Sequence, residues 1–353
     1  MLKIITPALF LILSTKAFAA NNLRSELSRY ILLRDRTIVD HGLKSQAHQS
    51  FFDLQINISS GIKKLIGDIN TSTDDSNSSS TKTSNVLAVL NRNINTERYI
   101  DIGAELALPL PYMQYGSYRF LPSLFIGMNL GGSLTISNKE DGLNPKAQTY
   151  LKQEMRYGLF TRMKWNDKKR ESLDLALYKV ETKDFLTQST AQAIAEDEKI
   201  ISTDDFDKKE SSYAIDLSYK RHFDDYSYLL EVLDLKLTQS GEKSIYGRTP
   251  LIHGRYEWNK SFLNMAVSPF LGLHYRKRYD LSDGIYLGAR FEGTKKYPFS
   301  FITKVSNQFL TFTPKITYKY FEFSYGLKTP YRNPQEDVWV SSVHSINLRV
   351  PFP

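Results

Sequence analysis

Basic side chains recur at alternate positions along several stretches of this sequence, and they are the residues most able to do chemistry. In "TYLKQEMRYGLFTRMKW" (149–165), charged residues occupy one parity, and apolar residues from Leu151 to Trp165 occupy the other. A period of two indicates an extended strand with one apolar and one charged face. The same parity in the other stretches predicts one shared basic surface: Lys152, Arg156, Arg162, Lys164, Arg255, Arg276, Arg290, Lys304, Lys315 and Arg349, with Lys220, Arg278 and Lys319 beside them.

Acidic residues on this parity are fewer: Asp101, Glu105, Glu154, Asp174, Asp216, Glu257, Glu292 and Glu322. Two kinds of chemistry fit such a surface. Charges that surround a water-filled passage select ions by sign, and a basic excess favours anions or small acidic solutes. Opposite charges on neighbouring strands can instead pair with each other and brace a closed wall. The sequence leaves both interpretations open.

The elements that carry these charges are segments of alternating apolar and polar residues, about 14 in number, with about 12 as the alternative. We expect strands at residues 51–59, 99–108, 118–136, 149–165, 171–180, 212–223, 226–238, 251–258, 263–279, 284–292, 298–305, 309–319, 321–328 and 338–352. Tight turns, such as 166–169 and 223–225, alternate with mostly longer connections, such as 60–97 and 181–211. This sorting is typical of an antiparallel up-and-down β-barrel. The predicted fold class is all-β, with one barrel domain over residues 51–353.

Three segments do not fit the strand pattern. Residues 70–84 contain no apolar residue. They are expected to form a flexible loop or linker, because they cannot bury a core. Residues 181–211 are rich in acidic residues, and this loop could stay solvated or fold into a basic lumen. Residues 23–38 have apolar residues at loosely helical spacing, which predicts a short helix in an N-terminal segment, 21–50.

The first 20 residues predict a signal peptide. Lys3 supplies a positive charge, residues 4–13 form an apolar stretch too short to span a membrane, and residues 17–19 fit a cleavage site. Cysteine is absent, which excludes disulfides, thiolate metal sites, a cysteine nucleophile and a lipidated cysteine. The net charge of +8 could suggest nucleic acid, but the basic residues alternate along strands instead of clustering in a tail.

The last strand is the most specific feature. In "HSINLRVPFP", the residues Ile346, Leu348, Val350 and Phe352 alternate with polar ones. This resembles the C-terminal strand of bacterial outer-membrane β-barrels, although Pro353 follows the aromatic residue. The resemblance covers about residues 51–353. It implies a transmembrane barrel in the bacterial outer membrane, with periplasmic ends and with 60–97 and 181–211 as long extracellular loops. It also implies lipid contact and recognition of the C-terminal strand as an insertion signal by the barrel-assembly machinery.

Three functions are compatible with such a barrel. The first is a porin-like passive channel with a net basic, anion-leaning lumen, lined by the basic residues named above. The second is a plugged transporter of hydrophobic or small solutes, in which residues 21–50 form a periplasmic or plug segment. Its resemblance to fatty-acid transporters is limited to strand number and layout, because their N-terminal Asn-Pro-Ala motif is absent. The third is a non-conducting surface or adhesion barrel that displays residues 70–84.

An enzyme, a cofactor and a metal site are not expected. Outer-membrane phospholipases use a His-x-Ser-Asn-Gly context, and only His344 with Ser345 matches part of it. His253 and His274 fall on the lumen parity with no serine or acid at a telling spacing. Metal-ligand spacing, glycine-rich phosphate loops and nucleophile elbows are also missing from the sequence.

Overall fold

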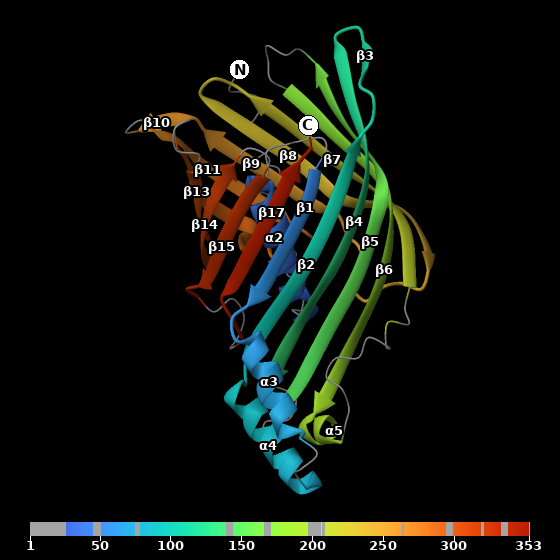
Figure 1. The fold of residues 1–353 in the computed structure, drawn as a ribbon, viewed down its shortest axis with the longest axis vertical. Coiled ribbons are helices and arrows are strands. Elements are labelled where there is room, and N and C mark those ends of the chain that lie inside the picture. Colours follow the sequence, from blue (N-terminus) through green and yellow to red (C-terminus); the bar gives the residue numbers. More distant parts are fainter. Residues whose placement is uncertain are drawn as a thin grey trace.

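The computed structural model describes residues 26–44, 51–74, 78–138, 144–165, 171–196, 206, 209–262, 265–293, 299–318, 321–332 and 338–352. The predicted signal peptide and the acidic residues of 197–205 lie outside these ranges. Within them, 14 antiparallel strands form one closed barrel (Figure 1). The predicted all-β fold and the strand number are confirmed.

Each strand of the wall pairs with its two neighbours, and β17 pairs with β1 to complete the circle. The wall consists of β1 (Phe51–Ser59), β2 (Thr96–Pro109), β4 (Tyr118–Ser137), β5 (Lys146–Trp165), β6 (Glu171–Thr190), β7 (Lys209–His222), β8 (Tyr226–Gly241), β9 (Leu251–Trp258), β11 (Met265–Tyr275), β12 (Ile285–Glu292), β13 (Phe299–Ser306), β14 (Phe309–Tyr318), β15 (Phe321–Pro330) and β17 (Val343–Pro351). Short strands pair with it: β3 (Met113–Tyr115) with β4, β10 (Lys260–Phe262) with β11, and β16 (Trp339–Val340) in parallel with β2. A closed sheet has no free edge, so its backbone amides are satisfied without water.

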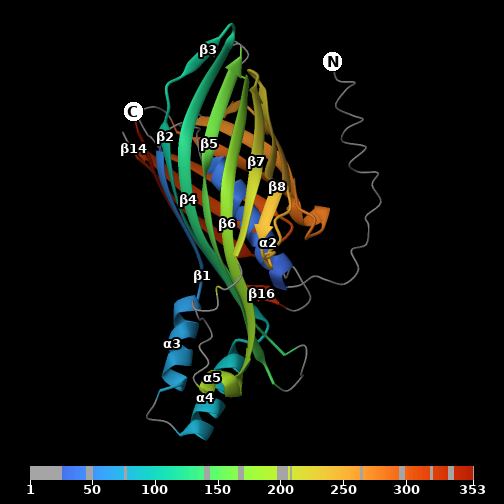
Figure 2. The ribbon, with the colours of Figure 1, turned by 90° about the vertical axis from the view of Figure 1, so that its right-hand side faces the viewer.

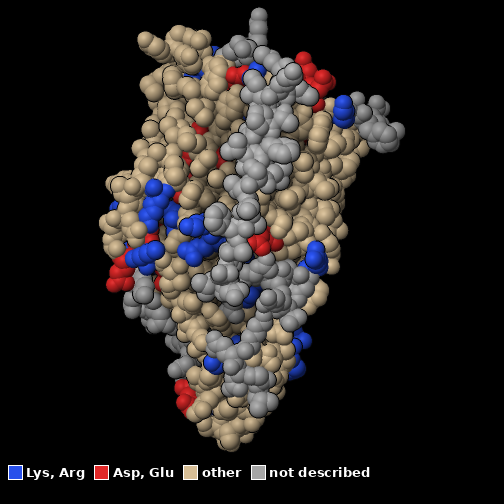
Figure 3. Space-filling model, turned by 180° about the vertical axis from the view of Figure 1, so that it is seen from behind, with Lys and Arg blue, Asp and Glu red and all other residues tan. Residues whose placement is uncertain are grey.

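The outer face of the wall is apolar. On β4, the outward side chains of Leu124, Ile126, Met128 and Leu130 are 41–54% exposed, whereas Ser123 on the inward parity is fully buried. Seen from behind, Lys and Arg gather in one patch left of the centre, and most of the other described surface in this view is neither basic nor acidic (Figure 3). An apolar exterior and a polar interior are the pattern of a barrel that stands in lipid.

Aromatic side chains gather at the barrel end that carries the tight turns. Trp165 stacks on Tyr219 with 6.0 Å between ring centroids, and Tyr226 stacks on Tyr256 at 5.3 Å. Such rings favour the interface between hydrocarbon and water, because they are apolar with a polar edge. This end therefore has the aromatic girdle of a membrane barrel.

The helices lie in two places. α2 (Glu26–Lys44) runs through the inside of the barrel, whereas α3 (Ile62–Ser72), α4 (Ser79–Arg92) and α5 (Ala191–Ala195) lie beyond the strands at the end opposite the tight turns (Figures 1 and 2). The 3-10 helix η2 (Leu281–Gly284) precedes β12. Among the helices that the structure describes, none is both long enough and apolar enough to cross a membrane.

The connection between β1 and β2 is mostly helical, so the prediction of a flexible loop over residues 70–84 is wrong for most of that segment. The Ser78 hydroxyl caps α4 by accepting a hydrogen bond from the backbone N–H of Thr81. The apolar side of α4 packs against α3, α5, β4 and β5 in a buried cluster that includes Val86, Val89 and Leu90. These apolar residues follow the polar stretch, so the stretch taken alone gives no sign of the helix.

β6 is also longer than predicted, because it continues to Thr190 instead of ending at residue 180. In this extension Asp184 is fully buried on the inner face, and Lys183 is exposed on the outer face. An outward position beyond the lipid can be charged, so the apolar alternation is lost while pairing with β5 and β7 continues. The predicted loop 181–211 is therefore partly strand.

Candidate functional site in the barrel lumen

α2 occupies the lumen, and its residues 28–37 are buried on all faces. From Ser28 to Thr37, no residue is more than 7% exposed. A surface helix buries one apolar stripe, but this helix carries charged residues among its buried ones. Buried polar groups need partners on every side, because a group left unpaired costs free energy. The barrel wall must therefore supply partners around the whole helix.

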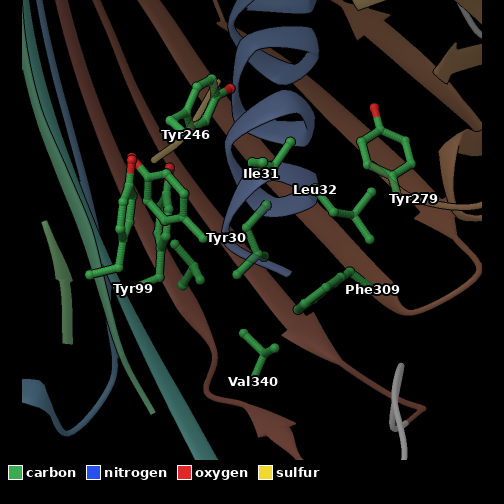
Figure 4. Close-up of a cluster of buried hydrophobic side chains, with 11 residues drawn as sticks. Tyr30, Ile31, Leu32, Tyr99, Tyr246, Tyr279, Phe309 and Val340 are labelled. Atoms are coloured by element: carbon green, nitrogen blue, oxygen red, sulfur yellow. The ribbon is translucent and has the colours of Figure 1, made fainter. Parts of the chain in front are cut away.

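Aromatic residues of the wall surround Tyr30 of α2 (Figure 4). Its ring centroid lies 5.7 Å from that of Tyr99 on β2, 4.9 Å from Tyr150 on β5 and 6.3 Å from Tyr246 in the β8–β9 connection. Gly131 on β4 makes room for this ring, since a Cβ there would lie 2.2 Å from the Tyr30 hydroxyl. The wall is thus shaped to receive this side chain.

The other end of α2 makes a second apolar contact. Val39 and Leu43 cluster with Phe270 on β11, Tyr286 on β12 and Ile302 on β13. This contact lies on strands far along the chain from those around Tyr30. α2 therefore packs against both halves of the barrel.

Between these apolar contacts, Glu154 of β5 collects several positive charges. Arg34 of α2 approaches it at 3.3 Å, and Arg248 of the β8–β9 connection approaches it at 2.8 Å. Lys152 and Arg156, on the same strand, also form salt bridges with Glu154. One buried carboxylate thus joins α2 to two parts of the wall.

Asp234 of β8 is the second carboxylate of this network. It contacts Arg248 at 2.5 Å and Arg276 at 3.0 Å. Arg276 also binds both carboxylate oxygens of Asp35 on α2, at 2.8 and 2.9 Å. Burial opposes ionisation of Arg248, but the carboxylates of Glu154 and Asp234 outweigh it and hold the pKa of Arg248 above its ordinary value. Arg248 therefore stays charged.

A local irregularity in β8 directs Asp234 into the lumen. Its φ is 59°, in the left-handed region that aspartate tolerates better than most residues, and the pairing of β7 with β8 shifts register nearby. The Asp234 N–H donates to the Asp216 carboxylate at 2.6 Å. Simple alternation would place Asp234 outward with Leu230, which is 56% exposed. The bulge reverses that direction, as bulges commonly do for functional side chains.

Arginines also bind the wall toward both ends of residues 28–37 of α2. Arg29 pairs with Glu97 on β2. Arg36 donates to the backbone carbonyl of Asp283 and to the Asn307 side chain, both at 2.9 Å. Burial lowers the pKa of Arg36 to about 10, against the opposing effect of Asp283, so Arg36 remains a cation at neutral pH.

Beyond Arg36, the charge of the contact changes sign. Asp40 of α2 pairs with Lys304 on β13 and, at 3.0 Å, with Lys328 on β15. His41 lies 3.3 Å from Asp53 on β1. Together with the contacts above, α2 is bonded to strands around most of the barrel circumference.

The structure divides the predicted basic residues into three groups. The network around α2 includes Lys152, Arg156, Arg276 and Lys304. A second group pairs with carboxylates of the wall nearer the tight turns: Arg162, Arg255, Arg290, Lys315 and Arg349. The third group is Lys164 alone, which is exposed. The carboxylates in the second group are Asp174, Glu257, Glu292, Glu322 and Asp53. Nine of the ten predicted basic residues therefore pair with carboxylates, as the bracing interpretation expects, and their role in lining a passage stays a prediction.

Sequence reasoning missed several members of the network. Glu97 lies just before a predicted strand, and Arg248 lies in a connection, so neither was assigned an inward parity. Asp234 was missed because of its bulge. The loosely helical spacing of apolar residues in 23–38 is the signal for α2, and it does not indicate which wall residues bind the helix.

The two histidines on the lumen parity, His253 and His274, have hydrogen-bonding partners beside them. His253 Nδ1 lies 2.6 Å from Glu231, and its Nε2 lies 2.7 Å from the Tyr286 hydroxyl. His274 Nδ1 lies 2.8 Å from the Tyr279 hydroxyl. No group of three or more potential metal ligands occurs in the part of the chain that the structure describes.

Comparison with known proteins adds only a general likeness. No family model and no curated protein matches the chain. The transport unit of the autotransporter AIDA-I from Escherichia coli aligns with a TM-score of 0.41 at 8% identity, over 93% of this chain and 98% of that one. The P. putida toluene transporter TodX aligns with a TM-score of 0.40 at 9% identity, over 88% and 92%. Likeness at this level carries no argument about function.

The wall itself decides the class of protein, because a closed antiparallel sheet with an apolar exterior, a charged interior and an aromatic girdle suits lipid. The chain has the architecture of a bacterial outer-membrane β-barrel protein.

Proposed function

We propose that this barrel is an outer-membrane channel whose passage is closed by α2, and that solute passes only when α2 yields. The observation that carries the proposal is the burial of α2 on all sides within the wall. A barrel of about 14 strands is wider than the eight-stranded type that side chains fill, so the helix occupies space that would otherwise be a passage. In this proposal the tight turns are periplasmic, and α3–α5 face the exterior.

The chemistry of the contact supports a closure that can be reversed. A helix that only filled space would be held best by apolar residues, since replacing buried ion pairs by apolar groups is often neutral or stabilising. Here Arg34, Asp35 and Asp40 form the central contacts instead. When α2 leaves, water can solvate the wall charges that it releases. The ionic contact therefore fixes the position of α2, but the free energy needed to move α2 out of the lumen stays moderate because water replaces the contacts.

The open state would have the anion preference expected from the basic residues. Without α2, Lys304 and Lys328 lose Asp40, and Arg276 keeps only Asp234 of its two carboxylates. Glu154, by contrast, keeps the wall cations that surround it. Removal of α2 also takes Arg29 from Glu97 and Arg34 from Glu154. The cations that lose a carboxylate, Arg276, Lys304 and Lys328, lie together on the β11–β15 side, and this side of the lumen would favour anions or small acidic solutes.

The test is conductance of the refolded mature chain and of a variant that lacks residues 26–44, in a planar bilayer with a salt gradient. We expect rare openings of the parent and sustained openings of the deletion variant, with a reversal potential that leans to anions. Lys304→Gln with Lys328→Gln in the deletion variant should reduce that leaning. A deletion variant that inserts as a folded barrel and conducts no more than the parent would refute the closure by α2.

A further inference from the structure

A serine and a histidine meet on the outer face of the barrel, at the point where β1 ends and β17 begins. Ser60 Oγ lies 2.9 Å from His344 Nε2, and His344 Nδ1 lies 2.6 Å from the Tyr325 hydroxyl on β15. When Nδ1 carries the ring proton and donates a hydrogen bond to the Tyr325 hydroxyl, Nε2 is free to accept the Ser60 proton. A hydroxyl, a base and a third group that orients the base form the arrangement that activates a nucleophile.

The position of this pair matches the depth of lipid esters. Along β17 toward the long connections, the outward residues Leu348 and Ile346 come first and His344 comes after them. On β1, Ile58 pairs with His344. Ile346 is 41% exposed and Tyr325 is 37% exposed, whereas Lys63 and Lys64, which follow Ser60, are exposed cations, so the pair lies near the end of the apolar band. Ester carbonyls of lipids lie where hydrocarbon meets the polar layer. An acyl ester of this leaflet would therefore be within reach of Ser60.

Donors for a developing negative charge lie next to the serine. α3 begins at Ile62, directly after Gly61, whose φ of 75° turns the chain from β1 into the helix. The first N–H groups of a helix have no partner within it, and they favour anions. Arg98 on β2 flanks this turn, since a Cβ on Gly61 would lie 3.7 Å from its Nε. That Nε is buried and has no hydrogen-bond partner among the described residues.

We propose that Ser60 and His344 hydrolyse acyl esters of lipids in the leaflet at the long-connection end of the barrel. Ser60 Oγ bonds to the ester carbonyl carbon while its proton passes to His344 Nε2. Collapse of the tetrahedral intermediate breaks the ester C–O bond, and the departing alcohol takes the proton from Nε2. A water molecule then gives a proton to Nε2 and bonds to the acyl carbon. Collapse of this second intermediate breaks the bond to Ser60 Oγ, which takes the proton back from Nε2, and the fatty acid is released. The helix N–H groups and Arg98 would stabilise the oxyanion of both intermediates.

The experiment uses the refolded full-length chain in vesicles of diacyl phospholipid, with fatty-acid release as one readout. Covalent labelling by a fluorophosphonate, which reacts with activated serines, is the second readout. Ser60→Ala should abolish both signals, and His344→Gln should lower hydrolysis by about 100-fold or more, the contribution expected of a general base. Tyr325→Phe should retain some hydrolysis with an altered pH profile, because Tyr325 acts as a positioning residue.

Ser345→Ala is the matched control, since Ser345 follows His344 on β17 and its side chain is buried on the inner face of the wall. It should hydrolyse and label like the parent. Equal fatty-acid release by the parent and Ser60→Ala, or absence of label at Ser60 in the folded parent, would overturn the proposal. The channel proposal is tested separately, because Ser60 lies outside the lumen and its substitution should leave conductance unchanged.

Discussion

The contact between Asp35 and Arg276 offers the sharpest test of closure by α2. Both side chains are completely buried, and they join α2 to the wall through two charge-assisted hydrogen bonds of 2.8 and 2.9 Å. Asp35→Asn keeps the size of the side chain and removes its charge. We expect the variant to fold with α2 in place but to hold it less firmly.

The expected magnitude follows from what Arg276 loses and keeps. Orphaning a buried charge costs about 3–5 kcal/mol, but Arg276 retains Asp234 at 3.0 Å. The loss is therefore closer to that of one hydrogen bond to a charged group, about 2 kcal/mol. Since about 1.4 kcal/mol corresponds to a factor of ten, the ratio of open to closed states should rise roughly 30-fold.

Single-channel recording at fixed voltage and salt measures this ratio directly from open and closed times. Asp225→Asn is the control, because it makes the same chemical change at an exposed turn residue. An unchanged ratio in Asp35→Asn, together with lower resistance of the barrel to unfolding, would refute the reasoning. It would mean that α2 is a permanent part of the core.

Three further outcomes are expected. Gly131→Ala should displace Tyr30, because the added Cβ would lie 2.2 Å from its hydroxyl, and should raise the open fraction in the same recordings. Phe352→Ser should slow assembly into membranes by the barrel-assembly machinery without changing the conductance of refolded protein, since the C-terminal strand is the predicted insertion signal; equal assembly rates would contradict this. Val86→Asp should make α3–α5 sensitive to limited proteolysis while the barrel stays intact, because it places a charge at a fully buried position of the helical cluster.

Local patterns along the chain were enough to predict the wall. In 149–165 every second residue must face lipid, so the apolar parity is imposed by the solvent on that side and can be read without knowing the neighbours. The same reasoning yielded the number of strands and the unequal ends. It failed at 181–190 and around Ser79, because outside the lipid no solvent imposes a pattern and packing against distant residues decides the structure.

What the sequence determined by itself is therefore the barrel: its class, its strand number, and which faces are apolar. What only the tertiary structure decided is the content of the lumen. Asp35 meets Arg276 across 241 positions of sequence, and Asp234 enters the lumen through a bulge that alternation does not predict. Charges of opposite sign can pair in many ways, and sequence spacing does not choose among them. The choice depends on where α2 lies when the sheet closes around it, because only then is the set of partners within reach of each charge fixed.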